Sequence, residues 1–114
     1  MKVLIVLFLL WTSIFANDIE VTIVYGNGTP DKIVQTHYTP GVSALEVLQK
    51  VSMVQTSKTG RFLFVRSIDG ITSQVGKFGW FYLIDGRSVH TTAENYPLQD
   101  AKSMLWIYKV EACY

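Results

Sequence analysis

The fold is decided by the stretch of sequence Gly76-Lys77-Phe78-Gly79-Trp80-Phe81-Tyr82-Leu83-Ile84-Asp85-Gly86. Four of its eleven residues are aromatic, and Asp85-Gly86 ends it with a turn signal. Aromatic and β-branched residues between turn signals predict a β-strand. Successive side chains of a strand point to opposite faces, and here both faces are apolar. Such a strand lies in the middle of a sheet, and its faces are either both covered or divided between the core and a partner.

Further strand patterns lie on both sides of this stretch. Residues 19–25 alternate apolar with polar side chains, and residues 33–38 can pair back on them across the turn-forming residues 26–31. Residues 61–68 and 103–110 are also rich in the residue types that favour strands. The chain therefore contains five predicted strands.

One segment has a helical pattern. Ser43 and Glu46 have the spacing of a capping box, in which each side chain satisfies a backbone amide of the first helical turn. Apolar residues then recur at helical spacing, which predicts a helix over residues 44–54, followed by a polar loop at residues 57–60. The order strand, strand, helix, strand, strand, strand predicts an α+β domain of the β-grasp type, in which the helix packs on one face of a mixed sheet.

The last three predicted strands, taken in phase, divide their side chains between two faces. The face expected under the helix carries Leu63, Val65, Phe81, Leu83, Leu105 and Ile107. The opposite face carries six aromatic residues, namely Phe62, Phe64, Trp80, Tyr82, Trp106 and Tyr108. Because one helix covers one face, the aromatic face is expected to form an open or half-covered platform, and rigid aromatic rings suit flat ligands and protein partners. The alternative is that loops 71–77 and 87–100 fold over this face as a second core.

Three motifs together resemble a known family. They are Ser67-Ile68-Asp69-Gly70, the stretch from Gly79 to Gly86, and the closing Leu105-Trp106-Ile107-Tyr108. With residues 40–45 at the expected helix entry, this pattern is similar to the C-terminal domain of transcobalamin and intrinsic factor. It is also similar to the small bacterial exported domains related to that domain.

This resemblance covers residues 19–110 and implies a β-grasp fold and, in the vitamin carriers, contact with cobalamin. The sequence departs from the family at Asp100-Ala101-Lys102, where members commonly have Gly-Asp before the last strand. The carriers also use a large helical domain to hold the other side of the corrinoid. The resemblance therefore implies a fold more strongly than a ligand.

The first sixteen residues have the layout of a secretory signal peptide. Lys2 is followed by an apolar run over residues 3–11, which is too short to span a bilayer, and Ala16 offers a cleavage position. The domain is therefore expected to comprise residues 17–114 and to be periplasmic or extracellular, without membrane insertion after cleavage. An uncleaved membrane anchor is the alternative.

Charge and chemistry-bearing residues argue against several function classes. Without Lys2 the chain has nine basic and nine acidic residues, and no basic patch points to nucleic acid. His37 and His90 lie on different segments without metal-ligand spacing, and Cys113 sits beside the C-terminus, where nothing would exclude water. The sequence therefore predicts no metal, no cofactor, no catalytic residue and no enzymatic activity.

The leading hypothesis is an exported, non-enzymatic domain that binds a small flat ligand, with cobalamin or another corrinoid as the candidate. Its predicted ligand-binding residues are Trp80, Tyr82, Trp106, Tyr108, Phe62 and Phe64. The alternative is an interaction module that docks a partner protein of the cell envelope through a sheet edge or through the same face. A ligand module binds alone, whereas an adaptor shows no binding until its partner is present.

Overall fold

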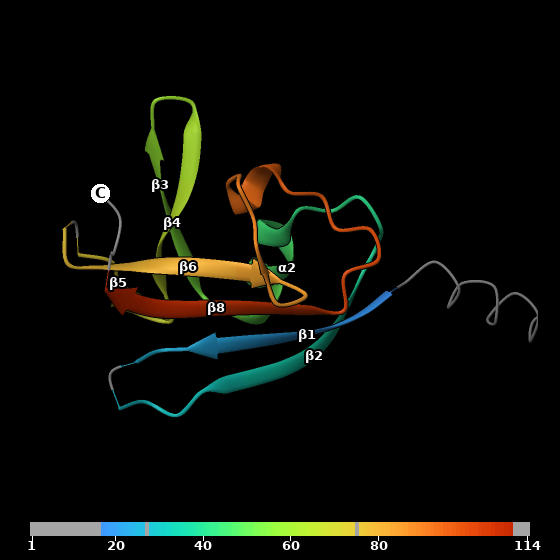
Figure 1. Cartoon of the computed structure of the whole chain (residues 1–114), viewed down its shortest axis with the longest axis horizontal. Helices are drawn as coiled ribbons and strands as arrows, with labels where there is room; N and C mark the ends of the chain where they lie inside the picture. The colour runs from blue at the N-terminus through green and yellow to red at the C-terminus, as the bar shows by residue number, and fades with distance from the viewer. Residues whose placement is uncertain (1–16, 27, 75, 111–114) are drawn as a thin grey trace, which may run out of the picture.

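Two β-sheets, one α-helix and a short 3-10 helix make up the described part of the chain (Figure 1). The computed structural model describes residues 17–26, 28–74 and 76–110. The predicted signal peptide and Cys113 lie outside these residues. Within them, the prediction of an α+β domain with one α-helix is confirmed.

The larger sheet has five strands in the order β2-β1-β8-β6-β7. The strands are β1 (Asn17–Val24), β2 (Lys32–Tyr38), β6 (Phe78–Ile84), β7 (Arg87–Ser88) and β8 (Ser103–Val110). At the centre β1 and β8 run parallel, and every other neighbouring pair is antiparallel. A parallel central pair with hairpins outside it corresponds to the mixed sheet that the sequence predicts.

The smaller sheet contains the strand that was expected next to β6. It consists of β3 (Val54–Thr59), β4 (Phe62–Ile68) and β5 (Ile71–Thr72), all antiparallel. The prediction that residues 61–68 belong to the main sheet is therefore wrong. Residues 54–59, expected as helix end and loop, instead pair with β4 across a two-residue turn, in which Gly60 has a φ of 63°.

The helix α2 (Ala44–Val51) begins where the capping residues predict and ends three residues early. The Ser43 hydroxyl accepts a hydrogen bond from the Glu46 amide at 3.1 Å. At the other end the Lys32 ammonium donates to the Val51 carbonyl at 2.8 Å, which satisfies a terminal acceptor of the helix. Val54 continues the apolar spacing of the helix but lies in β3.

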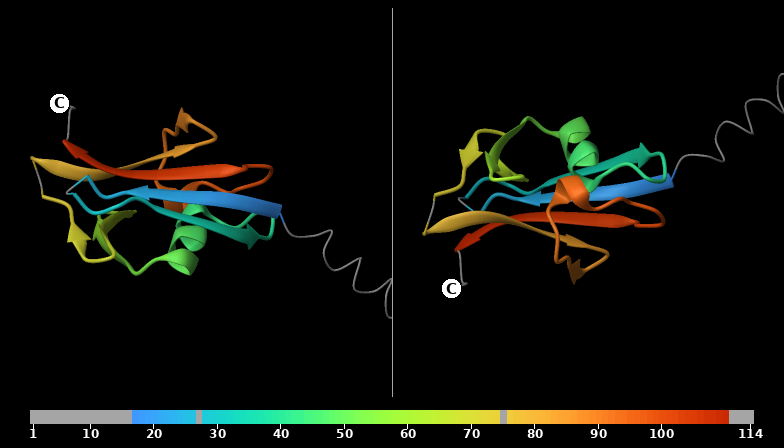
Figure 2. Two further views of the ribbon diagram at one scale, coloured as in Figure 1. Left: turned by 90° about the horizontal axis from the view of Figure 1, so that it is seen from below. Right: turned by 90° about the horizontal axis from the view of Figure 1, so that it is seen from above.

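Both α2 and the smaller sheet lie on the same side of the five-stranded sheet (Figure 2). Cross-strand rows on this inner face include Val21–Met104–Ile84 and Ile23–Trp106–Tyr82, and α2 contributes Leu45, Val47 and Leu48 to the same core. The aromatic face of the main sheet is thus the covered one, and the predicted assignment of the two faces is reversed. Val89 and Tyr96, from the loop at residues 87–100, also pack on this core. This agrees with the alternative prediction that this loop folds over the aromatic face.

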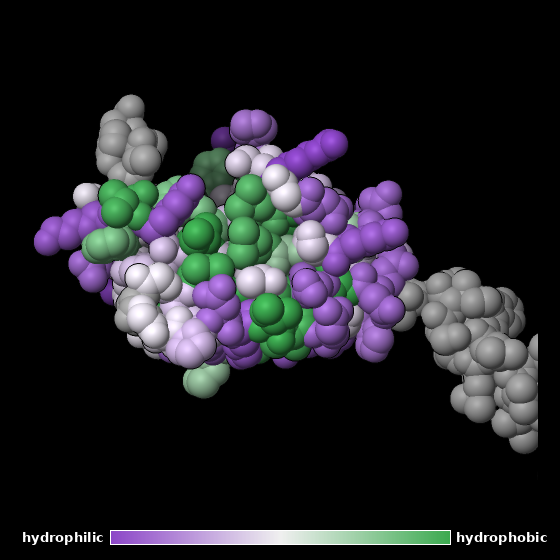
Figure 3. Space-filling model, turned by 60° about the horizontal axis from the view of Figure 1, so that its bottom comes forward, coloured by the Kyte–Doolittle hydropathy of each residue, from purple (hydrophilic) through white to green (hydrophobic). Residues whose placement is uncertain are grey.

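The outer face of the main sheet carries a second apolar surface. Its half-buried side chains are Val24, Phe81, Leu83, Leu105 and Ile107. Hydrophobic side chains gather in the middle of the surface in Figure 3, with hydrophilic side chains around them. The strand β6 therefore has one face in the core and the other toward solvent.

Candidate binding groove

Of the six predicted site residues, Trp106 lies in the core and Tyr82 is half-buried and packs against it. The Trp106 side chain is only 2% exposed and stacks on the Tyr82 ring, with centroids 4.9 Å apart. The Tyr82 hydroxyl donates to the Thr91 carbonyl, and burial raises the pKa of Tyr82 to about 12. The buried indole N–H of Trp106 has no hydrogen-bond partner in the described residues. A ligand could not stack on Trp106 without opening the core, and Trp106 covers one face of the Tyr82 ring.

Trp80 and Tyr108 hold the smaller sheet against the larger one. The Trp80 indole N–H donates to the Ile71 carbonyl at 2.9 Å, and the Tyr108 hydroxyl donates to the Thr72 carbonyl at 2.7 Å. The centroids of these two rings lie 5.1 Å apart, and the rings of Tyr25 and Trp80 form a T-shaped pair with centroids 6.2 Å apart. Because these contacts fix the Trp80 ring, its half-buried surface is preorganised.

Phe62 and Phe64 are exposed on the hairpin of β3 and β4, in the smaller sheet rather than in the sheet that carries the tryptophans. Their side chains are 45% and 47% exposed, and their ring centroids lie 6.4 Å apart. The hairpin extends beyond the outer edge of β6, the edge that does not face β8 (Figure 1). The six predicted aromatics therefore do not form one platform, but Phe64 and Trp80 line the same groove where the hairpin passes β6.

This groove has a volume of about 570 Å³, and we call it the edge groove. Its lining residues come from both sheets and the adjoining loop, and they are Ser57, Thr59, Phe64, Arg66, Ser73, Gly79, Trp80 and Phe81. The volume lies within the range of small-molecule sites, about 300–1,000 Å³. Its chemistry combines aromatic surface, hydroxyl groups and one guanidinium, and it includes no carboxylate.

The outer edge of β6 contributes free backbone groups beside this groove. Gln74 and Phe78 exchange two backbone hydrogen bonds there, at 2.8 and 2.9 Å. Because backbone polar groups of a strand alternate between its two edges, those of Trp80 and Tyr82 point the same way as those of Phe78. The strand β7 pairs only with the last two residues of β6. Within the described chain, Trp80 and Tyr82 therefore have no strand partner at this edge.

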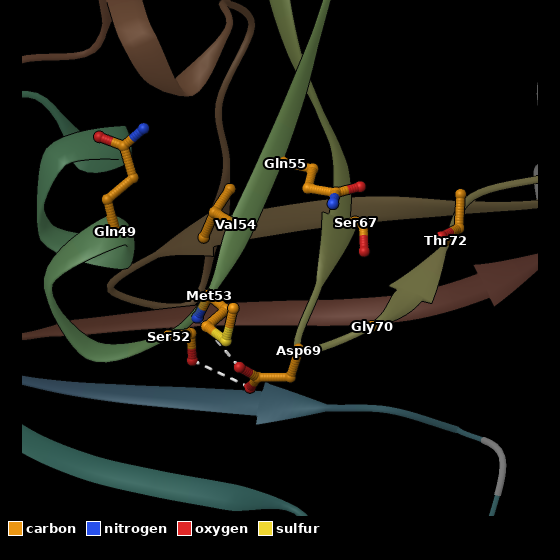
Figure 4. Close-up of a pocket in the computed structure, with 9 residues that line it drawn as sticks. All are labelled: Gln49, Ser52, Met53, Val54, Gln55, Ser67, Asp69, Gly70 and Thr72. Carbon is orange, nitrogen blue, oxygen red and sulfur yellow. Dashed lines mark hydrogen bonds between the residues drawn. The ribbon is translucent and has the colours of Figure 1, made fainter.

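A larger hollow, of about 840 Å³, lies beside the turn after β4 (Figure 4). Its side chains are mainly polar, and its carboxylate, Asp69, points toward Ser52 and Met53 in the close-up. Asp69 accepts hydrogen bonds from the Met53 amide at 3.0 Å and the Ser52 hydroxyl at 3.1 Å, and the Tyr25 hydroxyl also donates to it. The Asp69 carboxylate therefore has a structural role. The lining of this hollow includes no aromatic ring.

The contacts between Tyr25 and Asp69 shift the pKa values of both groups. Burial and the neighbouring Asp69 charge raise the pKa of the Tyr25 hydroxyl far above its ordinary value. Burial alone would raise the pKa of the Asp69 carboxyl, but its hydrogen bonds and the charge of Lys32 outweigh that effect and hold the pKa below its ordinary value. At neutral pH Asp69 is therefore ionised, and its carboxylate oxygens accept hydrogen bonds that hold the structure together.

The described residues contain no group of three or more metal-ligating side chains close enough to hold an ion. His37 instead pairs with Asp18 at 2.6 Å on the exposed surface of the first hairpin. None of the helices in the described ranges is long and apolar enough to cross a membrane. These observations concern only the residues that the structure describes.

Sequence reasoning identified Phe64 and Trp80 of the edge groove but missed its other lining residues. Ser57 and Thr59 fall in the predicted loop at residues 57–60, because that segment is polar. Their signal was the β-branched pattern of that segment followed by Gly60, which is typical of a hairpin. The place of Arg66 and Phe81 in the groove could not be predicted, because the groove lies beside an unpaired strand edge and no sequence pattern indicates which edges stay unpaired.

Comparisons with known proteins identify a family and a fold. A sequence model described as "Domain of unknown function (DUF4430)" matches residues 41–110. No curated protein matches the chain. Among solved structures, a protein described as a "putative metal binding protein from Ruminococcus gnavus" superposes with a TM-score of 0.69 at 23% identity, covering 83% of this chain and 98% of that one.

Haptocorrin in complex with Cbi superposes with a TM-score of 0.67 at 13% identity. The match covers 82% of this chain but 25% of haptocorrin, so the domain corresponds to about a quarter of that protein. At these identities both structures support the fold alone. The haptocorrin match agrees in fold with the resemblance to transcobalamin-type domains that the sequence motifs predict.

Proposed function

This chain belongs to the family of the domain of unknown function DUF4430, and from that premise we propose that it is an exported, non-enzymatic domain that binds a flat small ligand in the edge groove. The observation that carries the proposal is a groove of about 570 Å³ with rings from two sheets along its wall. The ligand-binding role predicted for Phe64 and Trp80 is kept. That of Trp106 and Tyr82 is replaced by a structural role.

The chemistry of the groove supports a flat ligand with polar substituents. Phe64 and Trp80 offer aromatic surface, and the indole of Trp80 is already fixed by its hydrogen bond to Ile71. The hydroxyls of Ser57 and Ser73, with the free backbone groups of β6, can pair with substituents at the rim. The lining includes no carboxylate, histidine or cysteine, which supports binding without catalysis.

A corrinoid is the first candidate ligand. It is a planar macrocycle that carries amide side chains, and these match a groove with aromatic walls and free backbone donors and acceptors. The complex of the structurally similar haptocorrin with Cbi makes this class the natural one to test. Export to the periplasm or the cell exterior rests on the signal-peptide pattern of residues 1–16.

The test is a tryptophan-fluorescence titration of the purified protein with cobalamin and cobinamide. Trp80 lines the groove and reports on occupancy, and N-acetyltryptophanamide corrects for light absorbed by the corrinoid. Phe64→Ala removes a groove side chain, whereas Phe62→Ala removes an equally exposed ring on the same strand outside the groove. This pair separates a groove effect from a general change of the hairpin.

We expect saturable quenching in the parent protein and in Phe62→Ala. Binding should weaken about tenfold in Phe64→Ala, which corresponds to roughly 1.4 kcal/mol for one lost stacking partner. No quenching by either corrinoid would remove corrinoid binding by this domain alone. Equal affinity of Phe64→Ala and the parent would remove the edge groove as the site.

A further inference from the structure

The outer edge of β6 is open over a short stretch between two capped ends. At one end the pair between Gln74 and Phe78 occupies the edge, and at the other end β7 occupies it. Between them the backbone N–H and C=O groups of Trp80 and Tyr82 have no partner within the described residues. Unpaired groups in a row are a template for another strand, and proteins usually cover or twist away such edges.

The hairpin of β3 and β4 forms a shelf beside this open edge. It projects past β6 (Figure 1), and Phe64 on its surface lines the same groove as Trp80. A segment paired to β6 would direct alternate side chains toward this shelf, because side chains of a strand alternate between faces. The open edge and the adjoining groove therefore have the form of a strand-addition site, in which the groove accommodates side chains of the added strand.

The charge of the shelf selects among possible segments. Residues 54–66 include Lys58, Arg61 and Arg66 and no acidic residue. Arg66 lines the edge groove, and none of these three cations forms an ion pair with another described residue. An acidic segment would supply the missing counter-charges, whereas a basic one would be repelled.

We infer that the open edge of β6 binds a short, extended, acidic peptide segment by strand addition, with the shelf of β3 and β4 beneath it. This goes beyond uptake of a flat small ligand, because the recognised group is a polypeptide backbone. The open edge spans about three residues, so the segment pairs through the four backbone groups of Trp80 and Tyr82. Peptide and flat ligand would occupy the same groove and exclude each other.

The test uses blocked synthetic hexapeptides and the purified protein, without any corrinoid. The binding peptide alternates glutamate and valine. One control carries a methyl group on every backbone nitrogen, which removes all N–H donors and keeps the side chains. A second control replaces glutamate by lysine. By tryptophan fluorescence, to which Trp80 in the groove contributes, we expect the glutamate peptide to bind at least tenfold more tightly than either control.

Amide hydrogen exchange supplies an independent readout at single residues. In the complex the amides of Trp80 and Tyr82 should become protected, whereas the amide of Phe81, which faces β8, should not change. Arg66→Glu should weaken peptide binding several-fold, and Arg87→Glu, an exposed arginine outside the groove, should not.

Three results would overturn the inference. They are no binding of the glutamate peptide at millimolar concentration, equal binding of its N-methylated form, and binding without new protection at Trp80 and Tyr82. A failed corrinoid titration would leave this result standing, because no corrinoid is present. Conversely, corrinoid binding without peptide binding would support the small-ligand function and contradict strand addition.

Discussion

Two aspartates, Asp69 and Asp85, show how single residues do more than their sequence pattern indicates. Each begins an Asp-Gly turn and has a positive φ, 51° and 50°, as the two-residue turns between antiparallel strands require. Each carboxylate also binds a distant element. Asp69 accepts from the Met53 amide at 3.0 Å, and Asp85 accepts from the Lys102 amide at 2.9 Å. The turn signal was predicted, but these long-range contacts were not.

Removing the Asp69 carboxylate should destabilise the protein strongly. Asp69→Ala leaves the donors of Tyr25, Ser52 and Met53 unpaired and places alanine at a positive φ, so we expect a loss of about 3 kcal/mol. Asp69→Asn keeps an acceptor and tolerates the backbone conformation, so its loss should be clearly smaller. Urea denaturation with constant m-values measures both losses. A stability of Asp69→Ala equal to that of the parent would contradict the role of this network.

The same carboxylate should make stability depend on pH in the acid range. Its pKa is lowered in the folded protein, so ionised Asp69 stabilises the fold at pH values above the unfolded pKa. That contribution is lost as the pH falls below about 3.8 and through the folded pKa. The stability difference between the parent and Asp69→Asn, measured in urea from pH 6 to pH 2, should therefore shrink toward acid. A constant difference would be inconsistent with the lowered pKa.

Among the elements, β6 differs most between its two edges. One edge pairs along its length with β8, and the other is free between Phe78 and β7. This asymmetry determines where the groove lies and what can bind in it. It also explains why the groove contains backbone as well as side-chain groups.

Hydrogen exchange in the free protein should show this asymmetry directly. The amides of Phe81 and Leu83 face β8 and should exchange slowly, whereas those of Trp80 and Tyr82 should exchange much faster. Amide-resolved NMR in heavy water measures all four rates. Uniformly slow exchange along β6 would mean that its outer edge is paired, and the strand-addition site would not exist.

Two glycines at turns test the packing around the sheet ends. Gly60 and Gly26 both have positive φ, but a Cβ at Gly60 would meet no atom within 4 Å, whereas at Gly26 it would lie 2.8 Å from the Tyr108 carbonyl oxygen. Gly60→Ala should therefore cost about 1–2 kcal/mol of unfolding free energy from backbone strain alone. Gly26→Ala should cost more. Equal losses in thermal unfolding would contradict the close approach at Gly26.

Several strand positions could be predicted from the sequence, because they depend on the local residue pattern. Strand partners could not, because they depend on pairing between segments far apart in the chain. The alternation in residues 19–25 and the aromatic run around Trp80 were sufficient to locate β1 and β6. The pattern of residues 61–68 identified a strand but could not name its partner, because β3 is polar. Both faces of β6 are apolar, so hydrophobicity alone could not say which face α2 covers.

At the scale of the whole molecule, the smaller sheet explains both the core and the groove. It crosses the inner face of the main sheet, where Trp80 and Tyr108 bind β5, and its hairpin then extends past β6 (Figure 1). The covered aromatic face and the edge groove are therefore consequences of one arrangement. A sheet that included residues 61–68 beside β6 would have no edge groove, because β6 would be paired on both sides.

The most direct measurement of the central claim is NMR chemical-shift mapping of the purified protein during titration with cobinamide. We expect saturable shifts in the lining of the edge groove, at Ser57, Thr59, Arg66, Gly79, Trp80 and Phe81. Shifts gathered instead at Gln49, Gln55 and Thr72 would place the ligand in the hollow beside Asp69 and contradict binding in the edge groove. The absence of any saturable shift would contradict ligand binding in the edge groove for this class of ligand.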